Sequence, residues 1–250
     1  MPQPHRSRVT VVIPVLDDAP HLARCLRALR RQDRVPDEVL VVDNGSRDDS
    51  ARVAQAHGAR VIVCEEPGIP AASAAGYDAA SGDVLLRLDA DCHPGPAWVR
   101  TMADAFDAHP GTVAVTGGAR FADGPALLRG PLAAAYLLAY AAVMTPLLGH
   151  LPLFGSNLGI RASCWREVRA HVHRHDADLH DDLDLAFHVG ERGRIQFVRR
   201  TGMTMSMRPF HSLTALRERA RRGSATVLAH FPADRPPRRW RRLRAGARRQ

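Results

Sequence analysis

Lysine is absent from this chain of 250 residues, so all 35 of its basic residues are arginines, against 26 acidic residues and a formal net charge of +9. Twelve of the arginines lie between Arg217 and Gln250, where only two acidic residues occur, and the rest of the chain is close to neutral. An excess of positive charge can indicate nucleic-acid or membrane binding. The exclusive use of arginine, however, indicates a compositional bias, so the charge by itself assigns no function.

Aromatic residues are scarce as well, at 5% of the chain, and Trp240 is the only one from residue 233 onward. Binding of single-stranded nucleic acid needs aromatic side chains between the basic ones, on which bases can stack. No nucleic acid is therefore expected as a partner. Contact with an anionic membrane is an alternative, because each arginine near such a surface contributes about 1 kcal/mol. We expect residues 226–250 to form a basic tail, disordered from Ala233 onward.

The few cysteines are widely spaced and form no Cys-x-x-Cys pair, which excludes a zinc ribbon and a dithiol redox motif. They indicate the reduced thiols of a cytoplasmic protein. The N-terminus lacks the apolar core of a signal peptide. We therefore expect a cytoplasmic location. Peripheral binding to the inner face of the cell membrane is compatible with it. The cysteines are Cys25, Cys64, Cys92 and Cys164.

Short apolar runs alternate with helical patterns along the first 110 residues. The β-branched run Val9–Val15 predicts a strand buried on both faces, and leucines at helical spacing predict a helix over His21–Arg31. This alternation predicts an α/β fold, a mostly parallel sheet flanked by helices. The same reasoning predicts strands over Glu38–Asp43, Arg60–Cys64 and Asp83–Leu88, and helices over Asp49–His57, Gly68–Ala80 and Gly95–Ala108.

The pattern changes in the second half, after a predicted strand over Val113–Arg120. The apolar segment Leu132–Leu148 is at or below the roughly 17–25 residues that a membrane span needs. We predict a buried or half-buried helix there, with a membrane-contacting helix as the alternative. Beyond a loop at Gly155–Asn157, an acidic run opens a further helix at Asp181, and a short strand is expected over Ile195–Val198.

Carboxylates follow three of the predicted strands. In parallel sheets, ligands bind at the carboxyl ends of the strands, and clustered carboxylates repel unless a cation or donor groups lie between them. Asp89 and Asp91 follow one strand and could hold Mg²⁺ or Mn²⁺, although they could also merely shape a turn. Asp43 follows another, either to bind a base or ribose or to form an Asx-turn or N-cap. Asp17 follows the first.

Further candidates lie in the second half. The acidic run around Asp182 holds more carboxylates than helix capping requires, so at least one of them is a catalytic candidate. His211 has no obvious companion ligand in the sequence, which favours an ordinary surface or core role over metal binding. Arg208 could pair with a diphosphate, as could a basic group that could equally form a solvated helix face: Arg217, Arg219, Arg221 and Arg222.

Taken together and in this order, the segments resemble the family 2 inverting glycosyltransferases of the GT-A fold, over about residues 8–225. The resemblance implies a single GT-A domain with a Rossmann-like sheet. Residues 8–110 would be its nucleotide-sugar-binding half and residues 111–225 its acceptor-binding half. The matching segments are Val11–Val15, Val41–Ser50, Leu88–Asp91, Gly155–Arg161 and Asp181–Leu185.

The resemblance also implies roles for individual residues. Asp182 would be the general base, and Asp91 of the Asp-x-Asp motif would bind Mn²⁺ or Mg²⁺, with His211 as a possible second ligand. The donor nucleotide would be held by Pro14, Val15, Asp17, Asp43 and Asp89. The acceptor or diphosphate would be contacted by Asn157, Asp181, Asp184 and Arg208.

Two departures from the family pattern are visible. Asp17-Asp18 stands where the family usually has Asn-Glu, and Asp181-Asp182 stands where it has Glu-Asp. The Gln-x-x-Arg-Trp motif of the polymerising members is missing, which favours a single transfer. The resemblance thus implies metal-dependent, inverting transfer of a sugar from a nucleoside-diphosphate sugar to the hydroxyl of a sugar, lipid-linked or small-molecule acceptor, in cell-envelope glycan or glycolipid synthesis.

The sequence also bears on three other functions. A dinucleotide-dependent oxidoreductase is excluded because the turn after the first strand has carboxylates and no Gly-x-Gly-x-x-Gly. A nucleotidyltransferase that acts on a sugar phosphate is harder to exclude, since it also uses a metal and carboxylates. A module that binds anionic membranes through its arginines is the alternative without catalysis.

Overall fold

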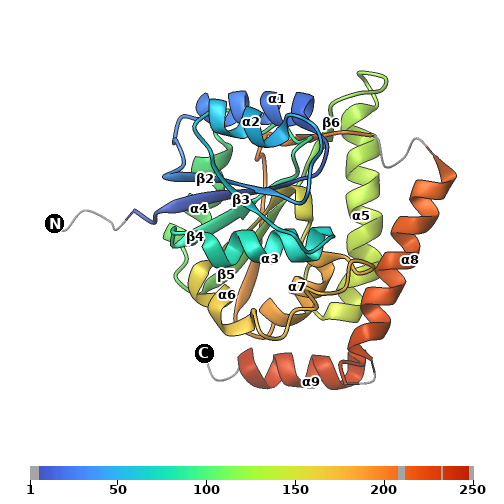
Figure 1. Ribbon diagram of the computed structural model, residues 1–250. Helices are drawn as coiled ribbons and strands as arrows, with labels where there is room; N and C mark the ends of the chain where they lie inside the picture. Colours follow the sequence, from blue (N-terminus) through green and yellow to red (C-terminus); the bar gives the residue numbers. More distant parts are fainter. Residues whose placement is uncertain (1–5, 208–211, 232, 248–250) are drawn as a thin grey trace.

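The sheet is built around its first strand. In the computed structural model, which describes residues 6–207, 212–231 and 233–247, β1 (Val9–Val15) pairs in parallel with β2 (Glu38–Asp43) and with β4 (Val84–Arg87). Its β-branched side chains suit this burial on both faces. The seven strands have the order β3-β2-β1-β4-β7-β5-β8 (Figure 1). The others are β3 (Arg60–Val63), β5 (Thr112–Gly117), β7 (Leu158–Arg161) and β8 (Arg194–Val198).

β7 is the antiparallel member of this sheet, since it runs against both of its neighbours, β4 and β5. The pairs β1–β2, β1–β4, β2–β3 and β5–β8 are parallel. The predicted α/β fold with a mostly parallel sheet is thereby confirmed. Strands from the second half of the chain extend the sheet formed by the first half, which places the ends of β1, β4 and β7 close together.

Helices cover both faces of the sheet (Figure 1). Alternate residues of β1 divide between two cores: Val11 and Ile13 belong to one core and Val12 to the other. This division follows from the two-residue period of a strand. The first core is closed by α1 (Ala19–Arg30), α2 (Ser50–Ala56) and α4 (Trp98–Asp107). The second is closed by α3 (Ile69–Ala79), α6 (Ala162–Val168) and α7 (Asp181–Val189).

Two long helices, α5 (Arg129–Leu148) and α8 (Leu213–His230), stand side by side at one edge of the sheet (Figure 1). Near them β6 (Arg120–Phe121) pairs in parallel with β9 (Thr204–Met205). Of the twenty residues of α5, Ala133 and Leu148 are buried, and Leu138 is 69% exposed. The helix is therefore half-buried, which is the second of the two predicted states, because most of its other residues are partly buried or exposed. By length and composition alone, it is long and apolar enough to cross a membrane.

The C-terminal segment differs from the prediction of a disordered tail, because α9 (Pro236–Ala247) is helical and docks against α5. Arg239 is fully buried and donates to the carbonyl oxygens of Leu148 at 2.6 Å and Phe187 at 2.7 Å. The indole of Trp240 donates to Pro146 O at 2.9 Å. The high density of charged residues in this segment predicts disorder. Composition alone does not show that one of these arginines, Arg239, forms hydrogen bonds with buried carbonyl oxygens.

Candidate functional site

A cavity of about 470 Å³ opens at the carboxyl ends of β1 and β4; we call it the rim cavity. Four predicted site residues lie in its wall together: Pro14, Val15, Asp89 and Asp91. Because both strands run in the same direction, the loops that follow them meet at one edge of the sheet. Other residues of its wall are Asp18, Asn44, Arg87, Ser156, Arg219 and Arg222.

A second cavity, of about 630 Å³, lies between α5 and α8 and is called the α5–α8 cavity. Asp182 and His180 are its polar contributions from the N-terminal end of α7. The other lining side chains are mostly apolar and include Val143, Met144, Leu147, Leu183, Leu216, Val227 and Leu228. Three residues, Tyr136, Phe154 and Arg219, line both cavities, so the two adjoin.

Arg87 links the two halves of the site. Its Nη2 lies 2.9 Å from Asp89 Oδ1 and 3.5 Å from Asp181 Oδ2, and its side chain is buried. Burial alone would lower the pKa of Arg87, but the carboxylates of Asp181 and Asp89 raise it above its ordinary value. The guanidinium therefore stays charged and separates carboxylates that would otherwise repel each other. An arginine within the otherwise apolar run Val84–Leu88 is a signal in the sequence that points to such a buried ion pair.

Asp89 and Asp91 offer hard oxygen ligands. A carboxylate oxygen of each, together with Cys92 Sγ, forms a group of atoms that lie within 4.8 Å of one another. Burial, helped by the two carboxylates, raises the pKa of the Cys92 thiol well above its usual value, so the sulfur keeps its proton. Asp89 also accepts a hydrogen bond from Ser156 Oγ at 2.5 Å. The donor chemistry thus fits Mn²⁺ or Mg²⁺, which prefer carboxylate oxygens.

Asp182 is fixed by two backbone donors. The N–H of Gly155 donates to its Oδ2 at 2.7 Å, and the N–H of Leu183 donates to its Oδ1 at 2.8 Å. Its position in the first turn of α7 also favours negative charge. A Cβ atom at Gly155 would overlap Arg87 Nη1 and approach Asp182 Oδ2 to 3.1 Å. Glycine is therefore required where this loop passes over the two charged side chains.

Asp181 turns toward α3, where Ser73 Oγ donates to its Oδ2 at 2.8 Å. Burial raises the pKa of Asp181, and the neighbouring carboxylates of Asp182 and Asp89 act in the same direction, whereas Arg87 and Ser73 oppose them. The residue therefore serves as the buried partner of Arg87. It lines neither of the two cavities.

Two predicted donor-binding residues have local roles. Asp17 has a positive φ of 49°, and its Oδ1 accepts from the backbone N–H of Arg47 at 2.6 Å. Asp43 Oδ1 accepts from the N–H of Ser46, three residues on, at 2.9 Å, so the carboxylate holds the turn after β2. Neither lines the rim cavity, and their neighbours Asp18 and Asn44 line it instead.

Two predicted acceptor residues are also displaced from the cavities. Asn157 is buried, accepts from Trp98 Nε1 at 2.8 Å and donates to Gly118 O at 2.8 Å, so it holds the loop before β7. Asp184 is buried among three histidines that are described below. The remaining two, Arg208 and His211, lie outside the described residues.

Comparison with known proteins gives a consistent picture. The family model of glycosyl transferase family 2 matches residues 10–154. The glycosyltransferase AglE of Haloferax volcanii is 36% identical over 99 residues, which cover 36% of this chain and 33% of that protein. An undecaprenyl-phosphate 4-deoxy-4-formamido-L-arabinose transferase of Pseudomonas fluorescens is 39% identical over 108 residues, 39% of this chain and 32% of that protein. The chain thus matches about a third of the length of these curated relatives.

Two solved structures share the fold. A mannosyltransferase of Pyrobaculum calidifontis, in complex with GDP-Man and Mn²⁺, has a TM-score of 0.67 at 22% identity, over 99% of this chain and 71% of that chain. The glucosyl-3-phosphoglycerate synthase of Mycobacterium tuberculosis, in complex with UDP, has a TM-score of 0.60 at 24% identity, over 89% of this chain and 79% of that chain.

Proposed function

The chain belongs to glycosyl transferase family 2, and on this premise we propose that it moves a sugar from a nucleoside-diphosphate sugar to an acceptor hydroxyl, with inversion at the anomeric carbon. The adjacency of two cavities carries the proposal. Asp91 lines the rim cavity, Asp182 lines the α5–α8 cavity, and Tyr136, Phe154 and Arg219 line both. A donor in the first and an acceptor in the second would meet at this shared wall.

Asp182 is the proposed general base. Two backbone N–H groups hold its carboxylate in a fixed orientation. It would take the proton of the acceptor hydroxyl while the acceptor oxygen bonds to the anomeric carbon. The bond from that carbon to the diphosphate oxygen breaks on the opposite face, which inverts the configuration. A positioned base of this kind contributes about 10²–10⁴-fold in rate.

The leaving diphosphate would be stabilised by positive charge in the rim cavity. Arg219 and Arg222 of α8 reach its wall. Arg219 Nη1 donates to Tyr136 Oη at 3.1 Å, which fixes the guanidinium at the border of the two cavities. When bound at Asp89 and Asp91, Mn²⁺ or Mg²⁺ would supply further charge stabilisation for the diphosphate. The mannosyltransferase of similar fold is in complex with GDP-Man and Mn²⁺, which supports a role for such a metal in this chain.

An acceptor carried on a lipid suits the second cavity. Its lining is mostly apolar and includes Leu228 of α8, which is 66% exposed. The similar Pseudomonas fluorescens protein is named as a transferase for undecaprenyl phosphate, which supports a lipid carrier. Peripheral contact of α5 and α8 with the inner face of the membrane would bring such an acceptor to Asp182, in glycolipid or cell-envelope synthesis.

The decisive experiment identifies the released product. The full chain is incubated with a panel of nucleoside-diphosphate sugars, Mn²⁺ or Mg²⁺, and lipid-linked acceptors. Release of free nucleoside diphosphate, with one sugar added per acceptor, is the expected result. A nucleotidyltransferase, which would use the same carboxylates and metal, would release pyrophosphate from a nucleoside triphosphate and a sugar phosphate instead. That outcome would overturn the proposed reaction while leaving the family membership unchanged.

A further inference from the structure

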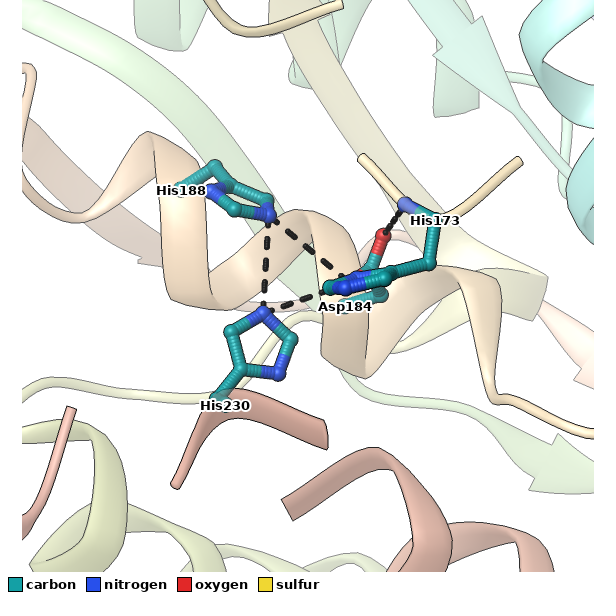
Figure 2. Close-up of side chains that lie close together, drawn as sticks. All are labelled: His173, Asp184, His188 and His230. Atoms are coloured by element: carbon teal, nitrogen blue, oxygen red, sulfur yellow. Dashed lines mark hydrogen bonds and ion pairs between the residues drawn. The ribbon is translucent and has the colours of Figure 1, made fainter. Parts of the chain in front are cut away.

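Three histidines and an aspartate meet on the side of α7 that faces the C-terminal end of α8 (Figure 2). His173 comes from the loop before α7, and Asp184 and His188 lie one turn apart on α7. His230 is the last residue of α8. None of the four lines the rim cavity or the α5–α8 cavity. Three segments of the chain thus contribute imidazole and carboxylate groups to one place that has no part in the proposed reaction.

Three distances within this cluster are close to those between the ligands of a small metal ion. His230 Nε2 lies 3.4 Å from His188 Nε2 and 3.3 Å from Asp184 Oδ1, and His188 Nε2 lies 3.7 Å from the same oxygen. Four ligands at about 2.0–2.1 Å from a tetrahedral Zn²⁺ are about 3.3–3.4 Å apart. His173 Nδ1 is closer, 2.6 Å from Asp184 Oδ1. One ligand atom from each residue lies within 4.8 Å of the others.

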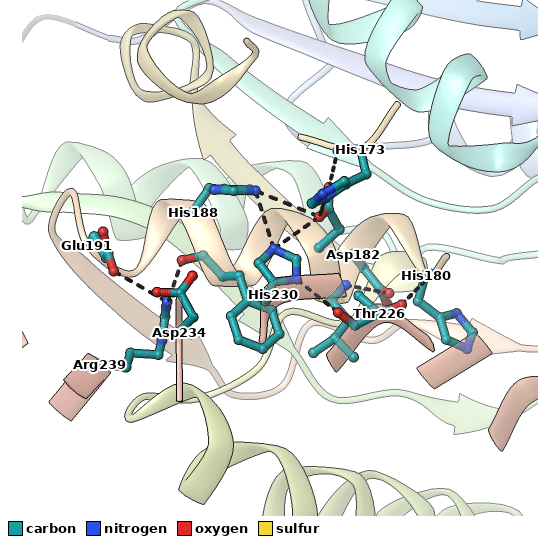
Figure 3. Close-up of polar contacts among 12 residues, drawn as sticks. His173, His180, Asp182, His188, Glu191, Thr226, His230, Asp234 and Arg239 are labelled. Carbon is teal, nitrogen blue, oxygen red and sulfur yellow. Dashed lines mark hydrogen bonds and ion pairs between the residues drawn. The ribbon is translucent and has the colours of Figure 1, made fainter. Parts of the chain in front are cut away.

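The surroundings orient His230 as a ligand. Its Nδ1 lies 2.9 Å from the carbonyl oxygen of Thr226, so the ring proton belongs on Nδ1 and the lone pair of Nε2 faces the cluster (Figure 3). Phe187 stacks on the ring at a centroid distance of 3.9 Å and an angle of 11°, which fixes its plane. A carbonyl partner for the second ring nitrogen is typical of metal-binding histidines.

Asp184 presents a carboxylate oxygen to these rings. Its side chain is 5% exposed, and its Oδ1 lies 2.6 Å from His173 Nδ1 and 3.3 Å from His230 Nε2. The backbone N–H of His173 donates to Oδ2 at 2.8 Å, which leaves Oδ1 toward the imidazoles. The lone pair of a neutral His230 and this carboxylate oxygen repel each other at 3.3 Å unless a cation or a shared proton lies between them.

We propose that His173, Asp184, His188 and His230 bind one structural Zn²⁺ ion. Imidazole nitrogens favour Zn²⁺ over Mg²⁺ and Mn²⁺, and four protein ligands leave no open position for a substrate. The ion would join the loop before α7, α7 itself and the end of α8. It would thereby fix the two helices that carry Asp182 and Arg219. Protons shared among the four side chains, without a metal, are the competing arrangement.

The test uses the full chain, freed of metal with a chelator and then loaded with Zn²⁺ or Co²⁺. We expect about one zinc ion per chain after dialysis, and an intense visible absorption from Co²⁺ in tetrahedral coordination. The variant His188→Gln/His230→Gln should lose both signals. His175→Gln is the matched control, because His175 lies in the same loop but is 76% exposed and pairs with Glu66 at 2.7 Å. Asp91→Asn should also keep the zinc, which separates this site from the rim cavity.

The wild-type protein alone can overturn the proposal. Absence of bound zinc, or the weak absorption of octahedral Co²⁺, would show that the four side chains share protons only. Retention of zinc by the folded double variant would place the metal elsewhere and overturn the assignment equally. If the double variant does not fold, the Co²⁺ absorption of the wild type still decides between these outcomes.

Discussion

The backbone N–H of Gly155 donates a hydrogen bond to Asp182 Oδ2 at 2.7 Å, although the two residues are 27 positions apart in the chain. The bond joins the loop before β7 to the first turn of α7. Arg87, on the neighbouring strand β4, lies directly beneath the same loop. The proposed base and the ion pairs of the rim cavity are thus held by one short segment, whose disturbance should affect both.

Gly155→Ala tests this segment. The added methyl group would overlap the Arg87 guanidinium and crowd Asp182, so we expect a loss of about 1–3 kcal/mol in the free energy of unfolding, as for other overpacked sites. The initial rate of sugar transfer should fall by more than the loss of folded protein accounts for, because the added methyl group displaces the carboxylate of Asp182. Denaturant unfolding and initial rates measure the two effects. Gly111→Ala is the control because a Cβ there meets no atom within 4 Å; equal effects of both variants would contradict the steric argument.

Arg87→Met tests the buried ion pairs. The change leaves Asp181 as an uncompensated buried carboxylate, which typically costs about 3–5 kcal/mol. Adding Asp181→Asn should recover part of that loss, because it removes the unpaired charge. Urea unfolding of the single and double variants measures both. Arg60→Met is the control, since Arg60 is 46% exposed where it pairs with Glu38 and should contribute about 0–1 kcal/mol. Lack of any recovery in the double variant would argue against the pairing.

His150 should make the docking of α9 sensitive to pH. Burial, together with nearby Arg239, lowers the pKa of His150 to about 4, and Arg239 Nη2 lies 3.0 Å from its Nε2. A histidine with a depressed pKa in the folded state contributes stability above its unfolded pKa of about 6.5, and this is lost as the pH falls toward 4. The free energy of unfolding should therefore decrease between those values. His150→Gln should flatten this part of the profile, and an unchanged profile would contradict the assignment.

Leu138→Gln tests membrane contact through α5. The side chain is 69% exposed on an apolar helix, so its replacement should reduce flotation with anionic liposomes. Val63→Gln is matched to it, because Val63 is also 69% exposed but lies on the edge strand β3 and not on α5. Equal flotation of wild type and both variants would argue against an interfacial α5.

The first half of the fold was predictable because its local patterns agree with its packing. β2 begins and ends at the predicted residues, Glu38 and Asp43, since its apolar run is bounded by polar residues on both sides. β7 was not predicted. It is a four-residue strand that contains Gly159, and a side chain there would meet Leu86 and Val115. Only the sheet explains the glycine, and the sequence pattern alone indicates no strand over these four residues.

The site was predictable where a motif directly follows a strand, as at Asp89 and Asp91. It was less predictable where the direction in which a side chain points from a helix decides which cavity it lines. Asp182 and Asp184 are two residues apart on a helix, which turns their side chains about 200° apart. One therefore lines the α5–α8 cavity, while the other enters the histidine cluster. Because the two residues are close in the sequence, the sequence analysis predicts that both lie in the active site. Likewise, the side chain of Asp43 is used in a hydrogen bond within the turn after β2, and the next residue, Asn44, lines the rim cavity instead.

The central claim is that Asp182 acts in transfer and not in donor binding. The variant Asp182→Asn keeps the shape of the side chain but removes the base, so turnover should fall by about 10²–10⁴-fold. Calorimetric titration with the nucleoside-diphosphate sugar and Mn²⁺ should give nearly the same affinity as for the wild type. Asp91→Asn provides the contrast, because it should weaken that binding. An Asp182→Asn variant that retains turnover, or loses donor affinity and turnover in equal measure, would contradict the account.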